Sequence, residues 1–349
     1  MVSIGIIGLG FMGMTHYRGI RNVRGGKVAA ICTRSPKKRA GDWRGLGGNF
    51  GEPGGMEDLS GIRTYEKIDD LLSDDSIDLV DICLPTSQHC EVAIAAMRAG
   101  KHVLVEKPIA LSLEDADRMV RVSEETGRLM MVAQVLPFFP EFAYLKQVVD
   151  GGEYGNVLGA HFKRVISQPN WTTAFGNMEK SGGPGVDLHI HDTHYILVLL
   201  GRPDRVVSSG RLVQDRYVEY ISTSYQYDSR PDLCVTCASG AISQQGRAFT
   251  HGFEVYMDRA TVLFEFSTLG GKPVVTMPVT LLTDDGEVRV PDLGDADPVV
   301  AFTNEIQAAV DAVESGEVAR EISGESAADA LRLCFVEVES VRLRQAVAV

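Results

Sequence analysis

A carboxylate and an imidazole stand four residues apart at Asp187 and His191. Gly183 and Gly185 come just before them and mark a loop that enters a helix over about residues 186–200. On one helix the two side chains share a face, where the carboxylate would orient the imidazole and favour its charged form. The spacing therefore predicts a general acid/base at His191 with Asp187 as its partner.

Two more histidines, His189 and His194, flank His191 and raise the question of a metal. On a helix His189 points about 200° away from His191, so the three rings do not converge. A zinc site would need the first part of the segment to be a loop. We therefore predict no metal. We interpret His194 as a substrate contact and His189 as a substrate contact or a packed histidine. In the preceding loop, Trp171 is predicted to border a sugar or to pack.

The first apolar run of the chain is followed by a GxGxxG motif, residues 8–13. It opens a helix over residues 12–23 in a βαβ pattern, which is the context in which this motif binds a dinucleotide. In that setting Gly8 allows the tight turn, Gly10 lets the pyrophosphate approach the backbone, and Gly13 lets helix and strand pack closely. The predicted cofactor site also includes the intervening Phe11 and Met12.

The end of the second predicted strand carries hydroxyl and basic side chains but no carboxylate. In dinucleotide-binding folds an Asp or Glu about 20 residues beyond the glycines binds the adenosine ribose. Thr33 stands at that position here, followed by Arg34, Ser35 and Lys38. Such groups would bind a 2′-phosphate, which a carboxylate would repel. The sequence predicts a preference for NADP(H), with NAD(H) as the second cofactor. A solvated basic turn is the alternative interpretation.

The elements around these residues predict two α/β domains. Residues 1–130 alternate short apolar strands with helices, which is typical of a doubly wound parallel sheet of the Rossmann type. Strand patterns dominate residues 205–290. We therefore expect residues 131–349 to form a second α/β domain with a large open, mainly antiparallel sheet. Residues 41–61 hold eight glycines and are interpreted as a solvent-exposed insertion.

Two further segments follow predicted strands: Leu84-Pro85-Thr86-Ser87-Gln88-His89 and Glu106-Lys107-Pro108. With them the sequence resembles the Gfo/Idh/MocA family, which includes glucose–fructose oxidoreductase and inositol dehydrogenase. The resemblance runs through GIIGLGFMG, LVDICLPTSQH, GKHVLVEKPIA and GGPGVDLHIHDTHYILVLLG. It is dense over the first ~130 residues, and in the second half it lies mainly in residues 180–201.

The resemblance implies an NAD(P)-dependent oxidoreductase that transfers a hydride between nicotinamide and a hydroxyl-bearing carbon of a sugar, polyol or sugar derivative. It places Lys107 near the nicotinamide and the substrate hydroxyl, where an ammonium would stabilise alkoxide charge. It assigns the acid/base role to His191 and the partner role to Asp187. Many relatives carry an Asp where His194 stands here. The strand ends would add these residues to the cofactor site: Leu84, Pro85, Thr86, His89, Glu106 and Lys107.

Two other functions fit the same family. One is cleavage of a glycoside by transient oxidation with a tightly bound cofactor. The other is a cofactor-sensing regulator without turnover, which would not need Lys107, Asp187 and His191. The resemblance also implies a homodimer or homotetramer formed through the open sheet.

Composition excludes several other classes. The 349 residues carry a formal charge of −13, which argues against a nucleic-acid partner. With 44% hydrophobic and 23% charged residues the profile is globular, and no apolar run has the ~20 residues that a membrane helix needs. The six cysteines follow no disulfide pattern, and Cys234 and Cys237 are interpreted as core residues. We expect a cytoplasmic protein whose substrate is a small carbohydrate or polyol.

Overall fold

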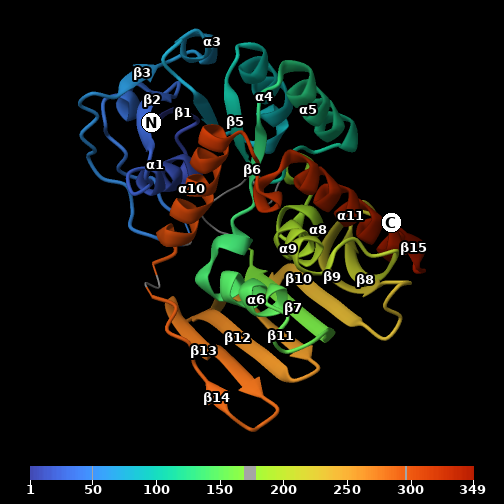
Figure 1. The fold of residues 1–349 in the computed structure, drawn as a ribbon. Coiled ribbons are helices and arrows are strands. Elements are labelled where there is room, and N and C mark those ends of the chain that lie inside the picture. The colour runs from blue at the N-terminus through green and yellow to red at the C-terminus, as the bar shows by residue number, and fades with distance from the viewer. Residues whose placement is uncertain (49, 169–177, 295–296) are drawn as a thin grey trace. The chain divides into compact units, whose positions relative to one another are not determined.

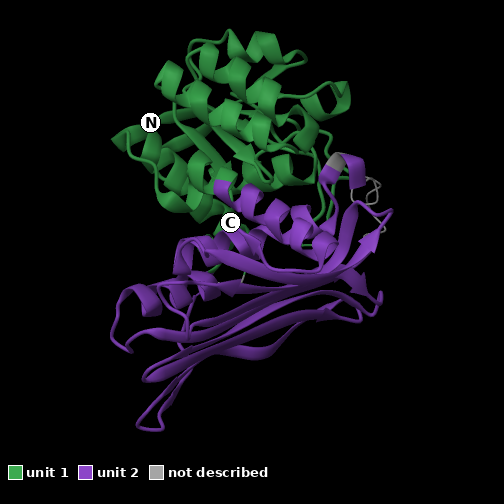
Figure 2. Cartoon of the chain, turned by 90° about the vertical axis from the view of Figure 1, so that its right-hand side faces the viewer, with its two compact units in different colours: residues 1–139, 295–328 green, residues 140–294, 329–349 purple. Residues whose placement is uncertain are grey.

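The computed structural model describes residues 1–48, 50–168, 178–294 and 297–349 (Figure 1). The chain divides into two compact units (Figure 2). Unit 1 comprises residues 1–139 and 295–328, and unit 2 comprises residues 140–294 and 329–349. Trp171 lies outside the described residues.

Unit 1 is built on a parallel sheet of six strands in the order β3-β2-β1-β4-β5-β6. The strands are β1 Val2–Ile7, β2 Gly26–Cys32, β3 Arg63–Tyr65, β4 Leu79–Ile82, β5 His102–Glu106 and β6 Met130–Ala133. The strands β4 and β6 are buried throughout because helices cover both faces of the sheet. The predicted Rossmann fold is confirmed, and the three-residue β3 is the strand that the sequence pattern missed.

Six helices belong to the described part of unit 1, and two of them, α2 and α5, begin at a serine that caps the helix. They are α1 Phe11–Ile20, α2 Pro36–Arg39, α3 Ile68–Leu72, α4 His89–Arg98, α5 Leu113–Thr126 and α10 Val299–Ser315, with short 3₁₀ turns η1 Thr86–Gln88, η2 Leu136–Phe138 and η3 Arg320–Ile322. Ser112 accepts a hydrogen bond from the Asp115 N–H at the start of α5, and Gly127 ends that helix with φ 64°.

The helix α10 joins unit 1 although it lies some 160 residues after β6. Ile306 and Val310 belong to the same core cluster as Ile4 and Met14, and Gly19 of α1 lies against Ile306. The predicted division into residues 1–130 and 131–349 therefore differs from the structure. A single boundary cannot describe a chain that leaves unit 1 after residue 139 and comes back to it at residues 295–328.

The glycine-rich stretch 41–61 is anchored in the core of unit 1 rather than fully solvent-exposed. Trp43 has no exposed surface, its ring lies edge-on to Tyr17 with centroids 4.6 Å apart, and its Nε1 donates to the Lys38 carbonyl. Phe50 packs against Phe11 with ring centroids 4.8 Å apart. The solvent-exposed interpretation is thus wrong at its two aromatic anchors, although the intervening glycines include exposed ones.

Unit 2 is built on a nine-stranded sheet in the order β14-β13-β12-β11-β7-β10-β9-β8-β15. The strands are β7 Val157–Ser167, β8 Arg205–Val213, β9 Tyr217–Gln226, β10 Cys234–Ser243, β11 Arg247–Met257, β12 Ala260–Leu269, β13 Lys272–Thr283, β14 Val288–Arg289 and β15 Val347–Ala348. Only the β7–β10 pair is parallel among these neighbours. The predicted open, mainly antiparallel sheet is confirmed.

One face of this sheet carries the helices of unit 2 (Figure 1). They are α6 Pro140–Asp150, α7 Met178–Ser181, α8 Pro184–Asp187, α9 Ile190–Leu200 and, from residue 329 on, α11 Gly324–Leu343. Cys237 is buried whereas Cys234 is exposed, because residues three apart on a strand point to opposite faces. The prediction of two core cysteines therefore holds for Cys237 and is wrong for Cys234.

The helix predicted over residues 186–200 is two helices in the structure. The helix α8 ends at Asp187, and α9 begins at Ile190. Between them the His189 N–H donates to the Pro184 carbonyl, five residues back instead of the four of an α-helix. The prediction of one continuous helix is therefore wrong: Asp187 ends α8 and His191 lies in the first turn of α9.

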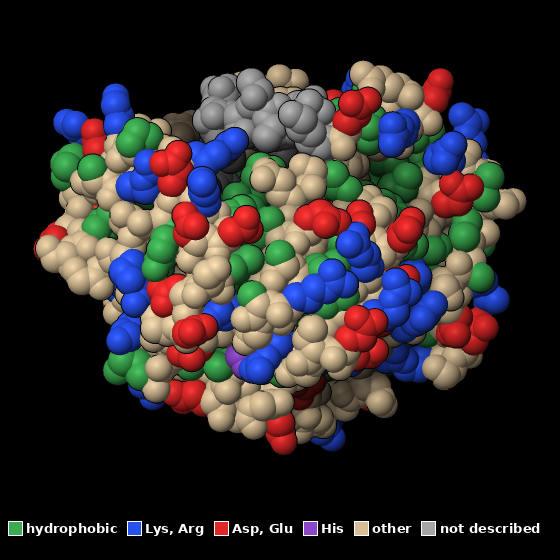
Figure 3. Space-filling model, turned by 90° about the horizontal axis from the view of Figure 1, so that it is seen from above, with side chains coloured by type: hydrophobic (Ala, Val, Ile, Leu, Met, Phe, Trp, Pro, Cys, Tyr) green, Lys and Arg blue, Asp and Glu red, His purple; other side chains and the backbone are tan. Residues whose placement is uncertain are grey.

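The surface carries charges of both signs. On the face shown in Figure 3, Lys and Arg side chains alternate with Asp and Glu. Among the described helices, none combines the length and the apolar character that crossing a bilayer requires.

Candidate catalytic and cofactor-binding residues

The three glycines of the fingerprint have the separate environments that their predicted roles require. Gly8 has φ +97°, and a Cβ built on it would lie 2.6 Å from the Cys83 carbonyl oxygen. A Cβ on Gly13 would overlap the carbonyl oxygen of Gly8. In contrast, no atom of the described structure comes within 4 Å of a Cβ built on Gly10. The backbone at Gly10, where α1 begins, thus leaves open the space in which a pyrophosphate would bind.

The end of β2 presents its hydroxyl and basic groups in different ways. The Arg34 side chain is exposed, while Thr33 and Ser35 are half-buried. The Ser35 hydroxyl accepts from the Lys38 N–H and begins α2. Lys38 Nζ donates to the Leu9 carbonyl at 2.6 Å, and burial lowers its pKa. Lys38 therefore ties this turn to the fingerprint loop, whereas Arg34 extends into solvent.

His89 joins the two loops that follow β4 and β5. Its Nδ1 lies 2.9 Å from the Pro108 carbonyl, and its Nε2 lies 2.8 Å from the Leu84 carbonyl. The side chain is 1% exposed, and burial lowers its pKa. Because both nitrogens face backbone carbonyls, His89 links the loops that follow β4 and β5 from inside the unit, and its contact with the cofactor stays a prediction. Leu84, Pro85 and Thr86 keep accessible surface.

Lys107 is the only residue between Val103 and Ala110 that is not buried. Its neighbour Glu106 is 8% exposed and turns inward, where its Oε2 accepts from the Lys107 backbone N–H at 3.0 Å. The other oxygen, Oε1, lies 3.1 Å from Nε2 of His16. Glu106 therefore supports the loop from inside the unit, and its contact with the cofactor stays a prediction.

Asp187 and His191 stand out in the same way in unit 2. Of residues 183–200, these two alone are not buried. The helix α9 is apolar on nearly all sides because it packs on the sheet, so a half-buried histidine near its start is an exception. Despite the break between α8 and α9, the two polar groups that the sequence predicts for acid/base chemistry are therefore the accessible ones.

His189 and His194 are both fully buried. The Nδ1 of His189 lies 2.9 Å from the Ser239 hydroxyl, and its Nε2 lies 3.1 Å from the Glu337 carboxylate. Burial is the largest single effect and opposes its charge, but Glu337 and Cys237 together outweigh it and raise the pKa of His189 well above its ordinary value. His189 is thus a packed histidine. The predicted substrate contacts of His189 and His194 are corrected, because neither side chain has accessible surface.

The sequence pattern missed two buried charged groups. In unit 1 the ring of His16, to which the sequence assigned no role, lies between Asp81 and Glu106. In unit 2 the guanidinium of Arg164 binds the carboxylate of Asp192, the neighbour of His191. One sequence signal could have indicated such groups: a charged residue inside an apolar run, as at Asp81 in the strand LVDI.

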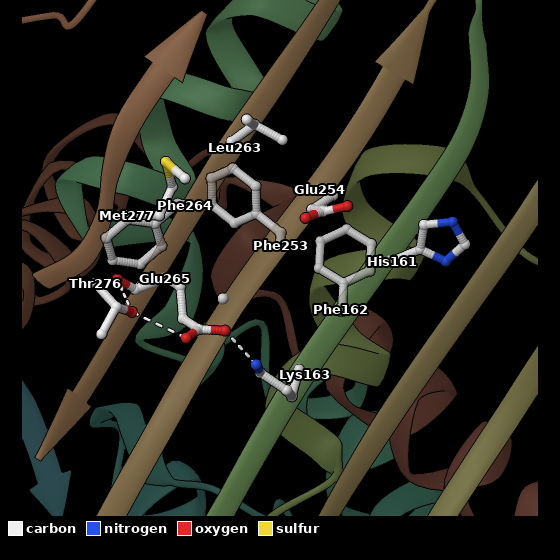
Figure 4. Close-up of a pocket in the computed structure, with 11 residues that line it drawn as sticks. His161, Phe162, Lys163, Phe253, Glu254, Leu263, Phe264, Glu265, Thr276 and Met277 are labelled. Atoms are coloured by element: carbon white, nitrogen blue, oxygen red, sulfur yellow. Dashed lines mark hydrogen bonds and ion pairs between the residues drawn. The ribbon is translucent and has the colours of Figure 1, made fainter. Parts of the chain in front are cut away.

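The open face of the unit 2 sheet carries a shallow pocket of about 340 Å³ (Figure 4). Lys163 points toward Glu265 and forms an ion pair with it, while the Thr276 hydroxyl donates to the same carboxylate. The residues that line the pocket belong to β7, β11, β12 and β13. Neither Asp187 nor His191 lines it, so this pocket is separate from the predicted catalytic groups.

Comparison with known proteins matches both halves of the chain to one family. Residues 2–134 match the model of the oxidoreductase family with an NAD-binding Rossmann fold, and residues 142–263 match the GFO/IDH/MocA C-terminal domain. Inositol 2-dehydrogenase of Rhizobium meliloti (strain 1021) is 28% identical, over 100% of this chain and 99% of that protein. scyllo-Inositol 2-dehydrogenase (NAD(+)) of Bacillus subtilis (strain 168) is 30% identical over 62% of this chain and 60% of its own length.

The fold has close counterparts among solved structures. Levoglucosan dehydrogenase, in complex with NADH and levoglucosan, superposes with a TM-score of 0.79 at 18% identity, covering 100% of this chain and 99% of that one. The resemblance drawn from the motifs is thereby confirmed on both halves. The chain belongs to the Gfo/Idh/MocA family of oxidoreductases.

Proposed function

We propose that this protein is an NAD(P)-dependent dehydrogenase that moves a hydride between nicotinamide and a hydroxyl-bearing carbon of a sugar, a polyol such as an inositol, or a sugar derivative. One observation carries the proposal. In two otherwise buried segments, residues 103–110 and 183–200, the accessible residues are Lys107, Asp187 and His191. Each bears a group that can move a proton or stabilise alkoxide charge.

The chemistry assigns one task to each group. The nicotinamide supplies the hydride acceptor or donor when it is bound. Lys107 donates a hydrogen bond to the reacting oxygen and stabilises the negative charge that develops there. His191 takes the proton of the hydroxyl or returns it, and Asp187 favours the charged form of that imidazole.

The preferred cofactor is NADP(H). This proposal is supported by the absence of a carboxylate at the end of β2 and by the exposed Arg34, which is available for a 2′-phosphate. The accessible backbone around Gly10 would bind the pyrophosphate, with Phe11 and Met12 beside it. NAD(H) would use the same fingerprint without the contact to Arg34.

Titration and turnover together test the function. Native mass spectrometry of the purified protein, followed by titration with NADP(H) and NAD(H), reports cofactor binding. A screen of inositols, aldoses and other polyols then follows NADPH or NADH absorbance. We expect Lys107→Met and His191→Asn to keep cofactor binding and to lose turnover by at least about a hundredfold.

Two exposed residues provide matched controls. Lys27→Met removes a lysine at the amino end of β2, and His161→Asn removes a histidine on the open sheet face. Both should leave turnover unchanged. Cofactor retained through purification, with sugar released and no net change in NADPH, would instead favour the glycoside-cleaving alternative. Cofactor binding without turnover of any substrate would favour the regulator.

We also propose that the open face of the unit 2 sheet joins copies of the chain into a homodimer or homotetramer. That face exposes apolar residues such as Tyr256 and Met277, which are 37% and 39% exposed. A cytoplasmic location is supported by the six cysteines, all of which are free. Sedimentation of the wild type and of Tyr256→Glu tests the oligomer, and the variant should shift it to the monomer.

A further inference from the structure

Four ionisable side chains are gathered in the interior of unit 1. They come from four different elements: His16 on α1, Asp81 on β4, Glu106 at the end of β5, and Glu305 on α10. Their exposed fractions are 0%, 1%, 8% and 0%. Charged groups are rarely buried without a specific arrangement, because each loses its hydration. Three of these elements, α1, β4 and β5, begin or end beside residues of the predicted cofactor site.

The contacts of His16 define its charge. Its Nδ1 lies 2.9 Å from Asp81 Oδ2, and its Nε2 lies 3.1 Å from Glu106 Oε1. A neutral imidazole carries one N–H only, so the imidazolium is the form that suits carboxylate oxygens near both nitrogens, although only the Nδ1 contact has hydrogen-bond geometry. Burial is the largest single effect and works against this charge, but Asp81 and Cys83 together outweigh it, and the pKa of His16 is raised well above its ordinary value.

Glu305 limits the negative charge of the cluster. Neither of its oxygens has a hydrogen-bond partner among the described residues. Burial raises its pKa well above the ordinary value; His16 acts against this shift, whereas Glu106 and Asp81 add to it. Burial without a hydrogen-bond partner therefore favours the neutral acid at Glu305. One imidazolium then faces two carboxylates, which is a far smaller cost than three buried carboxylates would be.

The cluster reaches Lys107 through the backbone. Glu106 binds His16 with one carboxylate oxygen and accepts from the Lys107 N–H with the other, at 3.0 Å. The residues on either side of Lys107 are buried, so the direction of its side chain depends on how this turn is held. The chain of contacts runs from α1, which begins at the fingerprint, to the residue that we assign to the substrate oxygen.

We propose that His16 is a positioning residue, which fixes the end of β5 through Glu106 and thereby aims Lys107 at the reacting oxygen. This role rests on the proposed function of Lys107. His16 itself is fully buried and acts on the substrate only through Glu106 and Lys107. Its imidazolium connects the fingerprint helix to the turn that carries Lys107, so that the cofactor and Lys107 keep a constant separation.

The test compares His16→Asn with His102→Asn. His102 is the first residue of the same strand, at its opposite end, where its Nδ1 accepts from the Leu129 N–H at 3.1 Å. Hydrogen exchange over residues 103–110 measures the order of the turn and does not depend on activity. We expect exchange in this segment to become about tenfold faster in His16→Asn and to stay unchanged in His102→Asn.

Kinetics on the substrate identified by the polyol screen complete the test. We expect His16→Asn to lower kcat about tenfold or more while the Kd of NADPH changes less than about threefold, since the fingerprint loop is intact. His102→Asn should leave both quantities unchanged. If His16→Asn does not fold, Glu106→Gln tests the same connection, because it removes the charge that binds His16 but keeps an oxygen for the Lys107 N–H.

Three results would overturn the proposal. One is unchanged exchange over residues 103–110 in both His16→Asn and Glu106→Gln. Another is a fall in kcat no larger than that of His102→Asn. The third is one tightly bound zinc per chain that His16→Asn abolishes, because the ligand atoms of His16, Asp81 and Cys83 lie within 4.8 Å of one another and a zinc ligand must be a neutral histidine. A wild type that binds no nucleotide would reject the proposed function, whereas exchange would still report on His16.

Discussion

Arg164 and Asp192 form a buried, two-pronged ion pair in unit 2. The Nε of Arg164 lies 2.7 Å from Asp192 Oδ2, and its Nη2 lies 3.1 Å from Oδ1. The residues are 5% and 0% exposed. Because Arg164 belongs to β7 and Asp192 to the first turn of α9, the pair attaches the start of the helix that carries His191 to the central strand of the sheet.

Removing one member of this pair should destabilise the protein strongly. Asp192→Ala leaves the guanidinium buried without its counter-charge, and such a change costs about 3–5 kcal/mol. Urea unfolding of the full chain measures it. Asp228→Ala is the control, because Asp228 pairs with Arg205 at 2.6 Å but both side chains are about half exposed.

A joint replacement separates the pair from its surroundings. Arg164→Met combined with Asp192→Leu removes both charges and should recover most of the stability lost by Asp192→Ala. Turnover should remain low in the double variant if the pair orients the start of α9. A double variant as unstable as Asp192→Ala would show that the loss comes from packing and not from the unpaired charge.

His251 should make the protein less stable in acid. It is buried, and burial together with Arg164, whose Nη1 lies 3.5 Å from its Nδ1, lowers its pKa well below the ordinary value. The unfolded chain therefore takes up a proton near pH 6.5 that the folded chain refuses. Stability from this group is complete above pH 6.5 and is lost below it, at up to about 1.4 kcal/mol per pH unit.

A variant without the titrating ring checks the sign. The rings of Phe142, Phe249, Phe264 and Phe266, which do not titrate, pack around His251, and Asp192 binds the guanidinium of Arg164 beside it. His251→Gln should flatten the loss of stability between pH 6.5 and about 5. His161→Gln, on the open sheet face, is the control. His189 has a raised pKa, so its contribution is lost above pH 6.5 and leaves the acid limb unaffected. An unchanged acid limb in His251→Gln would contradict the assignment.

The parts that sequence could predict are those encoded by contiguous residues. The strands of unit 1, the glycine fingerprint and the Glu106-Lys107-Pro108 turn are each continuous segments. The break between α8 and α9 could not be read, because every residue there is compatible with a helix and His189 is held by Ser239 and Glu337 from distant elements. The packing partner of α10 could not be predicted either. Its sequence shows that one face is apolar, but it does not show that this face packs on the core of unit 1.

Trp43 should be the anchor of the glycine-rich stretch. Trp43→Ala removes a fully buried ring and its hydrogen bond to the Lys38 carbonyl, and truncations of this size cost about 3–5 kcal/mol. Hydrogen exchange over residues 41–61 should rise along with the loss of stability in thermal unfolding. Arg44→Ala changes the exposed neighbour and serves as the control. Unchanged exchange in this stretch would show that Phe50 and the backbone suffice to hold it.

Arg34 should decide the choice between the two cofactors. It is exposed at the end of β2, where no carboxylate is available for the ribose of NAD(H) and a guanidinium can bind a 2′-phosphate with charge-assisted hydrogen bonds. Arg34→Ala should raise the Kd of NADPH about tenfold and leave that of NADH nearly unchanged, as calorimetric titration would show. Thr33→Asp should go further and favour NADH, because its carboxylate repels the phosphate and accepts from the ribose hydroxyls. Arg24→Ala, at an exposed position two residues before the same strand begins, controls for a general loss of positive charge. Equal changes for NADPH and NADH in Arg34→Ala would mean that this arginine contributes only long-range attraction and that the preference lies elsewhere.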